Sequence, residues 1–272
     1  MRHRTSWCIN LLLTVFPNAV KCVDEIGASL SSVFFTHVFA PFEMEGDGDS
    51  AVEQKLVHES WQRAAHFAQA RGIFVEFLAC VLPEDVEAVP SFARGAKELT
   101  YYATDARAHR LPTIGEIFRR GVEEGRGRYL VYTNIDIGTM EDFYVRSHTL
   151  LSQAEEQRES TSPSSSSEPP WMALEYTRVQ TAKLGRSPVT LDDILSWSPI
   201  GRHPGHDCFV VPRHLVPPML LTGGLVVGMP PWGVRAQSFV LEFFIGNHYP
   251  ICIYVPSDVC VCCDLFPSTL TE

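Results

Sequence analysis

The stretch Arg128-Tyr-Leu-Val-Tyr-Thr-Asn-Ile-Asp-Ile-Gly138 decides the fold that the sequence predicts. Its five strand-forming residues, Tyr129 to Thr133, are followed by two polar side chains and then by a glycine. An apolar, β-branched and aromatic run of this length is typical of a strand buried on both faces, as in a parallel sheet covered by helices. Because side chains alternate along a strand, we expect Asn134 and Asp136 to point the same way, at the carboxyl end where open α/β sheets bind ligands.

Strand and helix patterns alternate on the N-terminal side of this stretch. β-Rich runs predict two strands, and apolar residues at helical spacing predict a helix between them. A Thr-x-x-Glu pattern then predicts the capped start of a helix that leads into the central strand, and the weakly periodic segment before it is expected to be loop. These segments are, in chain order, Ser32–Ala40, Val52–Ala70, Ile73–Leu82, Glu84–Leu111 (loop) and Thr113–Glu116 (helix start).

The C-terminal side gives further elements. A capping box at Thr139-Met-Glu-Asp142 predicts a helix toward Leu151, with Asp142 explained as a cap. Alternation predicts a strand over Leu174–Gln180, and Thr190-Leu-Asp-Asp193 begins a short helix. Cys208–Pro212 is expected to be another strand.

Length and patterning together predict a single α/β domain with a mostly parallel central sheet flanked by helices. The domain is placed at residues 32–241 of the 272, and it carries a mobile Ser/Pro-rich insertion at 154–170. Residues 242–272 form a divergent C-terminal tail, and residues 1–31 an N-terminal segment. In that segment a basic start precedes an apolar run, Cys8–Phe16, which is either a signal-like region or the first element of the fold. The run is too short to span a bilayer, so we expect no transmembrane segment and a cytoplasmic protein, or a secretory one if the run is a signal.

Composition excludes some classes of function. A net charge of −10 argues against a general affinity for nucleic acid or anionic membranes. Any bound phosphate must therefore be met by a local cation, either Arg, Lys or a metal. Eight cysteines in a chain of this length are too few for a dense disulfide framework, and Cys8, Cys22, Cys80 and Cys208 lie far apart in the sequence, so free thiols are expected.

A second polar cluster, Gly201-Arg-His-Pro-Gly-His-Asp207, lies directly before a predicted strand. Its two histidines and its aspartate have the chemistry to ligate a metal or to orient a substrate hydroxyl. The same residues also suit a structural turn in which Asp207 bonds neighbouring amides. The sequence leaves both interpretations open.

Four segments resemble, in the same order, uncharacterised proteins with the nucleotide-diphospho-sugar transferase fold, the GT-A type of glycosyltransferase. The resemblance covers roughly Val33 to Arg235 and implies a GT-A or Rossmann-like domain; it is more specific for fold than for reaction. The four segments are Thr36–Phe42, Phe77–Asp85, Tyr129–Ile137 and His203–Phe209.

The resemblance also implies a site. In such transferases an Asp-x-Asp motif at the end of a central strand holds a divalent cation, and here Asn134-Ile-Asp136 takes that place. Asp136 then carries the Mg²⁺ or Mn²⁺, because hard cations prefer oxygen ligands, while asparagine at the first position removes one charge. Arg178 is the candidate for pairing with a phosphate, with a surface ion pair as the alternative. His206 or Asp207 is the candidate catalytic base, and Glu175 is a weaker one.

Three functions follow from these residues. The first is a glycosyltransferase of hexosyl type that binds a nucleotide sugar and an acceptor. The second is a metal-assisted hydrolase that uses Asp136 with His203, His206 and Asp207. The third is a non-catalytic interaction protein on a degenerate transferase scaffold, which the asparagine and the unusual tail favour. The first accounts for most of the pattern.

Overall fold

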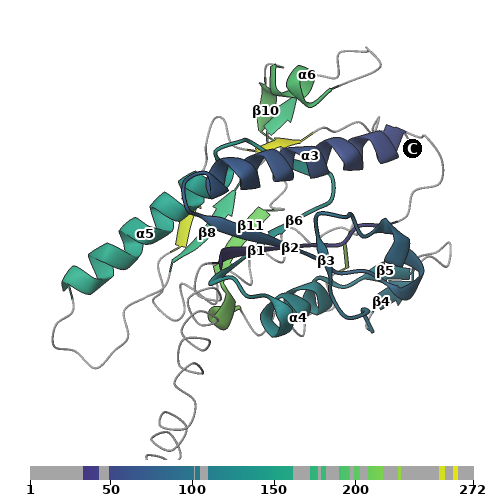
Figure 1. The fold of residues 1–272 in the computed structure, drawn as a ribbon, viewed down its shortest axis with the longest axis horizontal. Coiled ribbons are helices and arrows are strands. Elements are labelled where there is room, and N and C mark those ends of the chain that lie inside the picture. Colours follow the sequence, from purple (N-terminus) through teal and green to yellow (C-terminus); the bar gives the residue numbers. More distant parts are fainter. Residues whose placement is uncertain are drawn as a thin grey trace, which may run out of the picture.

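A seven-stranded sheet forms the centre of the molecule (Figure 1). The computed structural model describes residues 33–42, 49–100, 102–104, 110–161, 172–176, 179–181, 190–196, 199–202, 208–216, 226–227, 251–254 and 260–262. In spatial order the strands are β12 (Ile251–Tyr254), β8 (Ala173–Tyr176), β11 (Cys208–Pro212), β6 (Tyr129–Thr133), β1 (Val33–Phe39), β2 (Phe74–Ala79) and β3 (Arg94–Gly95).

Every neighbouring pair in this sheet is parallel except the two pairs made by β11, which runs antiparallel to both β6 and β8. Helices α3 (Asp49–Gln69) and α5 (Phe143–Thr161) cover one face, and α4 (Ile114–Glu124) covers the other (Figure 1). The predicted fold class, a mostly parallel sheet flanked by helices, is therefore confirmed.

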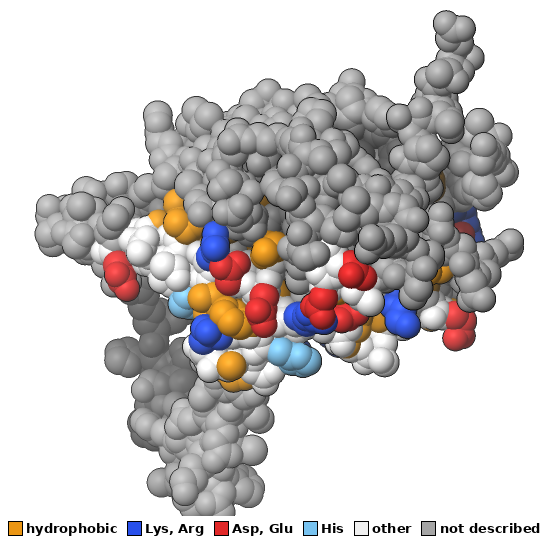
Figure 2. Space-filling view, turned by 90° about the horizontal axis from the view of Figure 1, so that it is seen from above, with side chains coloured by type: hydrophobic (Ala, Val, Ile, Leu, Met, Phe, Trp, Pro, Cys, Tyr) orange, Lys and Arg blue, Asp and Glu red, His pale blue; other side chains and the backbone are white. Residues whose placement is uncertain are grey.

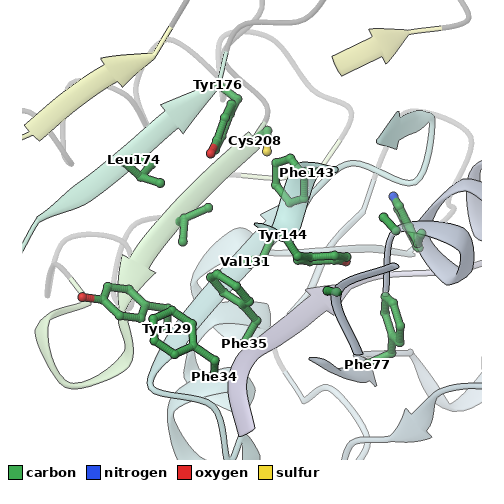
Figure 3. Close-up of a cluster of buried hydrophobic side chains, with 14 of the residues drawn as sticks. Phe34, Phe35, Phe77, Tyr129, Val131, Phe143, Tyr144, Leu174, Tyr176 and Cys208 are labelled. Atoms are coloured by element: carbon green, nitrogen blue, oxygen red, sulfur yellow. The ribbon is translucent and has the colours of Figure 1, made fainter. Parts of the chain in front are cut away.

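Each face of the sheet has its own hydrophobic core, as the strand alternation requires. Along β1, Phe35 and Phe39 pack with Trp61 of α3, whereas Val38 packs with Ile117 of α4. Figure 3 shows the first core, in which aromatic side chains from strands and from α5 fill the space between them. The labelled members are Phe34, Phe35, Phe77, Tyr129, Val131, Phe143, Tyr144, Leu174, Tyr176 and Cys208.

Helix α3 ends at Gln69, and Gly72 follows as the stop that the sequence predicts. This glycine has a φ of +77°, and the amide of Ile73 bonds to the carbonyl of Ala68 while that of Gly72 bonds to Gln69. These two bonds form a Schellman motif, which needs a left-handed residue at the position of Gly72. The chain is thereby turned from α3 directly into β2.

Helix α4 begins as predicted at Thr113, whose hydroxyl accepts a hydrogen bond from the amide of Glu116. The carboxylate of Glu116, however, is bound to Thr100 and to Arg119. It stabilises the preceding loop instead of completing the capping box. Burial acts to raise the pKa of Glu116, but the bonds from Arg119 and Thr100 outweigh it and hold the pKa below its ordinary value.

The prediction that Thr139 caps the next helix is wrong. Thr139 lies in strand β7 (Ile137–Thr139), and its buried hydroxyl oxygen has no hydrogen-bond partner among the described residues. Helix α5 begins at Phe143, and Asp142, directly before it, forms an ion pair of 2.5 Å with Arg146. The helix also runs on to Thr161, so the first part of the predicted mobile insertion, 154–161, is helical.

Two other segments differ from their predictions. The expected loop from Glu84 to Leu111 contains η1 (Pro83–Ala88), β3 and most of a hairpin of β4 (Tyr102–Thr104) and β5 (Arg110–Pro112). Long-range contacts such as the Arg110–Glu84 ion pair organise it, and periodicity does not reveal such contacts. The expected strand Leu174–Gln180 is two strands, β8 and β9 (Val179–Thr181), because the partners change from one sheet to another.

A smaller sheet of four strands lies beside the main one. Its order is β10 (Pro199–Arg202), β9, β13 (Cys260–Cys262) and β7, so the C-terminal tail supplies one strand to each sheet. Helix α6 (Leu191–Ser196) begins directly after Thr190, as predicted. Thr190 and Asp193 bond each other there in a reciprocal capping box. A short helix, η2 (Arg213–Leu215), follows β11.

Acidic and basic side chains are mixed on the described part of the face in Figure 2, with hydrophobic side chains between them. On α3, for example, Arg63 pairs with Glu59 at 2.9 Å and with Asp192 of α6 at 2.5 Å. Within the described ranges, no helix combines the length and apolar character needed to cross a membrane. The N-terminal segment 1–31 lies outside the described residues.

Candidate functional site

Strand β6 ends at Thr133, and the polar pair of the predicted site lies in the turn that follows it. The amide of Ile137 bonds to the carbonyl of Asn134 at 3.2 Å, which closes a four-residue turn leading into β7. Strand alternation therefore does not extend to Asp136, contrary to expectation. Asn134 and Asp136 are both partly exposed, at the carboxyl end of a fully buried strand.

Asn134 is held by its own strand. The hydroxyl of Tyr132 donates a hydrogen bond of 2.9 Å to its amide oxygen Oδ1. That oxygen retains one lone pair for a further contact. Asp136 is therefore the carboxylate of this turn, and Asn134 is a neutral neighbour whose orientation is fixed.

Helix α3 fixes the far side of the turn. The indole nitrogen of Trp61 donates to the carbonyl of Ile137 at 2.9 Å, and the hydroxyl of Ser60 accepts from the amide of Thr139 at 3.0 Å. Both bonds are buried. The segment that carries Asp136 is thus attached to a helix on one side and to the central strand on the other.

The ends of two more strands meet this turn. Cys208, the first residue of β11, is in register with Thr133 on one side and with Tyr176, the last residue of β8, on the other. In the sequence, the second polar cluster directly precedes β11, and Arg178 follows shortly after β8. The residues themselves, His203, His206, Asp207 and Arg178, lie outside the described part of the chain.

Glu175, the weaker candidate base, lies within β8 in register with Phe209. Among the described residues, no group of three or more His, Cys, Asp or Glu side chains is arranged to hold a metal ion. Of the residues that the sequence predicts as metal ligands, Asp136 is the one that lies in the described part of the chain. Cys80 is a buried free thiol, as expected, and Cys208 is buried as well.

Sequence reasoning missed a buried polar group behind the turn. His37, in the middle of β1, bonds through Nδ1 to the hydroxyl of Tyr144 at 2.6 Å and through Nε2 to that of Thr133 at 2.8 Å. Complete burial, with a smaller effect of the charge on His58, lowers the pKa of His37 to about 3, so its ring is neutral. A histidine inside the apolar run Val33–Phe39 was the available signal.

A second histidine lies nearby on α3. Burial lowers the pKa of His58 to about 4, and its ring packs on Phe39, Trp61 and Phe92. Its Nε2 is buried and has no hydrogen-bond partner within the described ranges. His37 and His58 are thus both neutral near neutral pH, and neither supplies a positive charge there.

No family model matches the sequence, and no curated protein matches it. Solved structures with similar folds include 4-diphosphocytidyl-2C-methyl-D-erythritol synthase from Anaerococcus prevotii, with 10% identity, a TM-score of 0.41, and coverage of 84% of this chain and 89% of that one. Residues 1–349 of S. aureus TarS give 8% identity and a TM-score of 0.41, over 85% of this chain and 60% of that one. A Drosophila β1,4-galactosyltransferase 7 mutant, in complex with manganese, UDP-Gal and xylobiose, has 11% identity and a TM-score of 0.35, with coverage of 84% of this chain and 70% of that one.

Proposed function

We propose that this protein is a glycosyltransferase that binds a nucleotide sugar through a divalent cation held by Asp136. The observation that carries the proposal is the placement of Asp136 in an anchored, partly exposed turn at the carboxyl end of the central strand. Ligands of open α/β sheets bind at this end. The carboxylate suits Mg²⁺ or Mn²⁺, which often use only one or two protein carboxylates beside the phosphates of a substrate.

The remaining roles are assigned to neighbouring segments. Arg178 follows β8 and is proposed to pair with a phosphate, since guanidinium binds phosphate bidentately. His206 or Asp207 precedes β11 and is proposed as the general base that takes a proton from the acceptor hydroxyl. These assignments are supported by the strand register, in which Cys208 of β11 pairs with Thr133 of β6 on one side and with Tyr176 of β8 on the other.

The proposed reaction is a displacement at the anomeric carbon of a hexosyl donor. The acceptor oxygen forms a bond to that carbon, the bond to the diphosphate oxygen breaks, and the acceptor proton passes to the base. A bound cation would neutralise the leaving diphosphate. Asn134, which brings no charge, is proposed to contact the donor through its remaining lone pair or its amide nitrogen.

Ligand-induced stabilisation tests the binding. The thermal midpoint is measured with UDP, GDP and their sugars, once with MnCl2 and once with EDTA. We expect a nucleotide or nucleotide sugar to raise the midpoint in the presence of MnCl2. At a ligand concentration of about 100 times Kd, binding stabilises the folded state by about 2.7 kcal/mol, a shift of several degrees for a chain of this size. Asp136→Ala should abolish the shift.

Asp192→Asn is the matched control. It removes an exposed carboxylate that pairs with Arg63, and it should leave the nucleotide shift unchanged. If no nucleotide stabilises the wild type, or if Asp136→Ala responds like the wild type, the proposal is wrong. Manganese-dependent release of UDP or GDP from the stabilising sugar nucleotide then separates an enzyme from a protein that only binds it.

A further inference from the structure

The buried imidazole of His37 connects three elements behind the proposed site. It lies on β1, its Nδ1 meets Tyr144 of α5, and its Nε2 meets Thr133 at the end of β6. Tyr144 belongs to the aromatic core shown in Figure 3. The three groups form one hydrogen-bonded chain from a helix across β1 to the last residue of the central strand.

Burying these three polar groups costs free energy, so packing alone does not explain the hydrogen-bonded chain. The ring of His37 packs among aromatic side chains in tilted contacts, with Trp61 at 4.6 Å and Phe77 at 5.5 Å between ring centroids. An aliphatic or phenyl side chain would fill such a place without needing two polar partners. Since the ring is neutral, one nitrogen donates and the other accepts, which ties it to both hydroxyls at once.

The partner of His37 is the residue at which the site begins. Thr133 is followed directly by Asn134, and it is paired through its backbone with Cys208. His37 therefore holds the strand end on the face covered by α3 and α5. On the other face, Tyr132 holds Asn134.

The same histidine also packs against the group that fixes the far side of the turn. Trp61, whose ring contacts that of His37 at a tilt, donates to the carbonyl of Ile137. The turn that carries Asp136 is thus fixed at its entry through Thr133 and at its exit through Ile137, by two side chains in mutual contact. Such support is what determines how well a ligating carboxylate is preorganised.

We propose that His37 is a positioning residue for the cation site: acting through Thr133, it holds the turn in the geometry in which Asp136 binds the metal. This inference rests on the proposed function, because it concerns the same cation. It goes beyond it by assigning metal affinity to a side chain that touches neither metal nor substrate.

Manganese binding in the presence of UDP tests the role, measured by electron paramagnetic resonance of free Mn²⁺ with the full chain. Loss of a side chain that orients a metal ligand typically costs 10-fold to 100-fold in affinity. Thr133→Val and His37→Phe should therefore weaken Mn²⁺ binding by about tenfold or more. His37→Gln, which keeps a donor and an acceptor, should recover part of the loss.

Thr36→Val is the matched control. Thr36 is equally buried on β1, but its hydroxyl donates to Glu76 at 2.6 Å and accepts from Gly127 at 2.8 Å, on the opposite face of the sheet. It should lose stability as Thr133→Val does, yet bind Mn²⁺ with the wild-type affinity. If Thr133→Val fails to fold, Tyr144→Phe, which removes one hydroxyl from the same hydrogen-bonded chain, replaces it in the comparison.

The outcomes separate the two proposals. A wild type that binds no Mn²⁺ with UDP overturns the proposed function, and the positioning role with it. A wild type that binds, together with Thr133→Val and His37→Phe variants of unchanged affinity, overturns the positioning role alone. Equal losses in Thr36→Val and Thr133→Val would show a general effect of stability and would also overturn it.

Discussion

Glu76→Gln should destabilise the protein at neutral pH and do so much less in acid. Glu76 is 9% exposed, and its carboxylate accepts hydrogen bonds from the hydroxyl of Thr36 at 2.6 Å, from the amide of Arg126, and from Nε of Arg126 at 2.7 Å. Thr36 in turn accepts from Gly127. One carboxylate thus joins β2, β1 and the loop after α4.

The expected magnitude follows from these three bonds. Glutamine keeps one oxygen, which can still accept from Thr36 and from the amide of Arg126. Its NH2 group, however, then faces Nε of Arg126, so a charge-assisted bond is replaced by two opposed donors. A hydrogen bond to a charged group contributes about 1.5–3 kcal/mol, and we expect a loss of about 2–3 kcal/mol in the free energy of unfolding.

The pH dependence has a definite sign. Burial acts to raise the pKa of Glu76, but the hydrogen bonds from Thr36 and Arg126 outweigh it and hold the pKa below its ordinary value of 4.5. A depressed pKa in the folded state means that the stabilisation is complete above about pH 4.5 and is lost as the pH falls through the folded-state pKa. The difference between wild type and Glu76→Gln should shrink over that range.

Urea denaturation at pH 7 and at successively lower pH measures this difference. Glu84→Gln is the control, because Glu84 pairs with Arg110 at the surface, where both side chains are more than a third exposed. Such a pair contributes about 0–1 kcal/mol, so this variant should resemble the wild type. An equal loss in the two variants at pH 7, or a Glu76→Gln effect independent of pH, would show that the buried network is not what stabilises the loop.

Three further predictions concern the backbone, a helix cap and a titration. Gly127→Ala should cost about 2 kcal/mol or more in urea denaturation, because an added Cβ would lie 2.4 Å from the backbone nitrogen of Thr36; Gly95→Ala, with nothing within 4 Å, should be nearly neutral. Thr113→Ala should remove the cap of α4 at a cost of about 1 kcal/mol, also measured in urea. Since His37 stays neutral in the fold until about pH 3 but takes up a proton near pH 6.5 when unfolded, wild-type stability should fall as the pH drops through this window. The fall should be smaller in His37→Gln, and a fall of equal steepness would contradict the assignment.

The local sequence pattern was enough to predict the main helices and strands, because interactions between residues close in sequence determine them. The buried character of Tyr129–Thr133, the stop at Gly72 and the cap at Thr113 each depend on residues within a few positions of one another. Apolar periodicity also determined which side of α3 faces the sheet, since Trp61 and Ala64 are buried as the spacing predicts. The α/β class follows from the order of such elements along the chain.

Only the tertiary structure decided how the candidate site is built. The sequence predicted that strand alternation would extend over Asn134 and Asp136, but the strand ends at Thr133 and a turn follows, which alternation cannot foresee. His37 gives no sign in the sequence of which hydroxyls it will meet, because its partners lie 96 and 107 residues away. Periodicity records which face a side chain takes; hydrogen bonds between distant segments exist only after the sheet has brought those segments together.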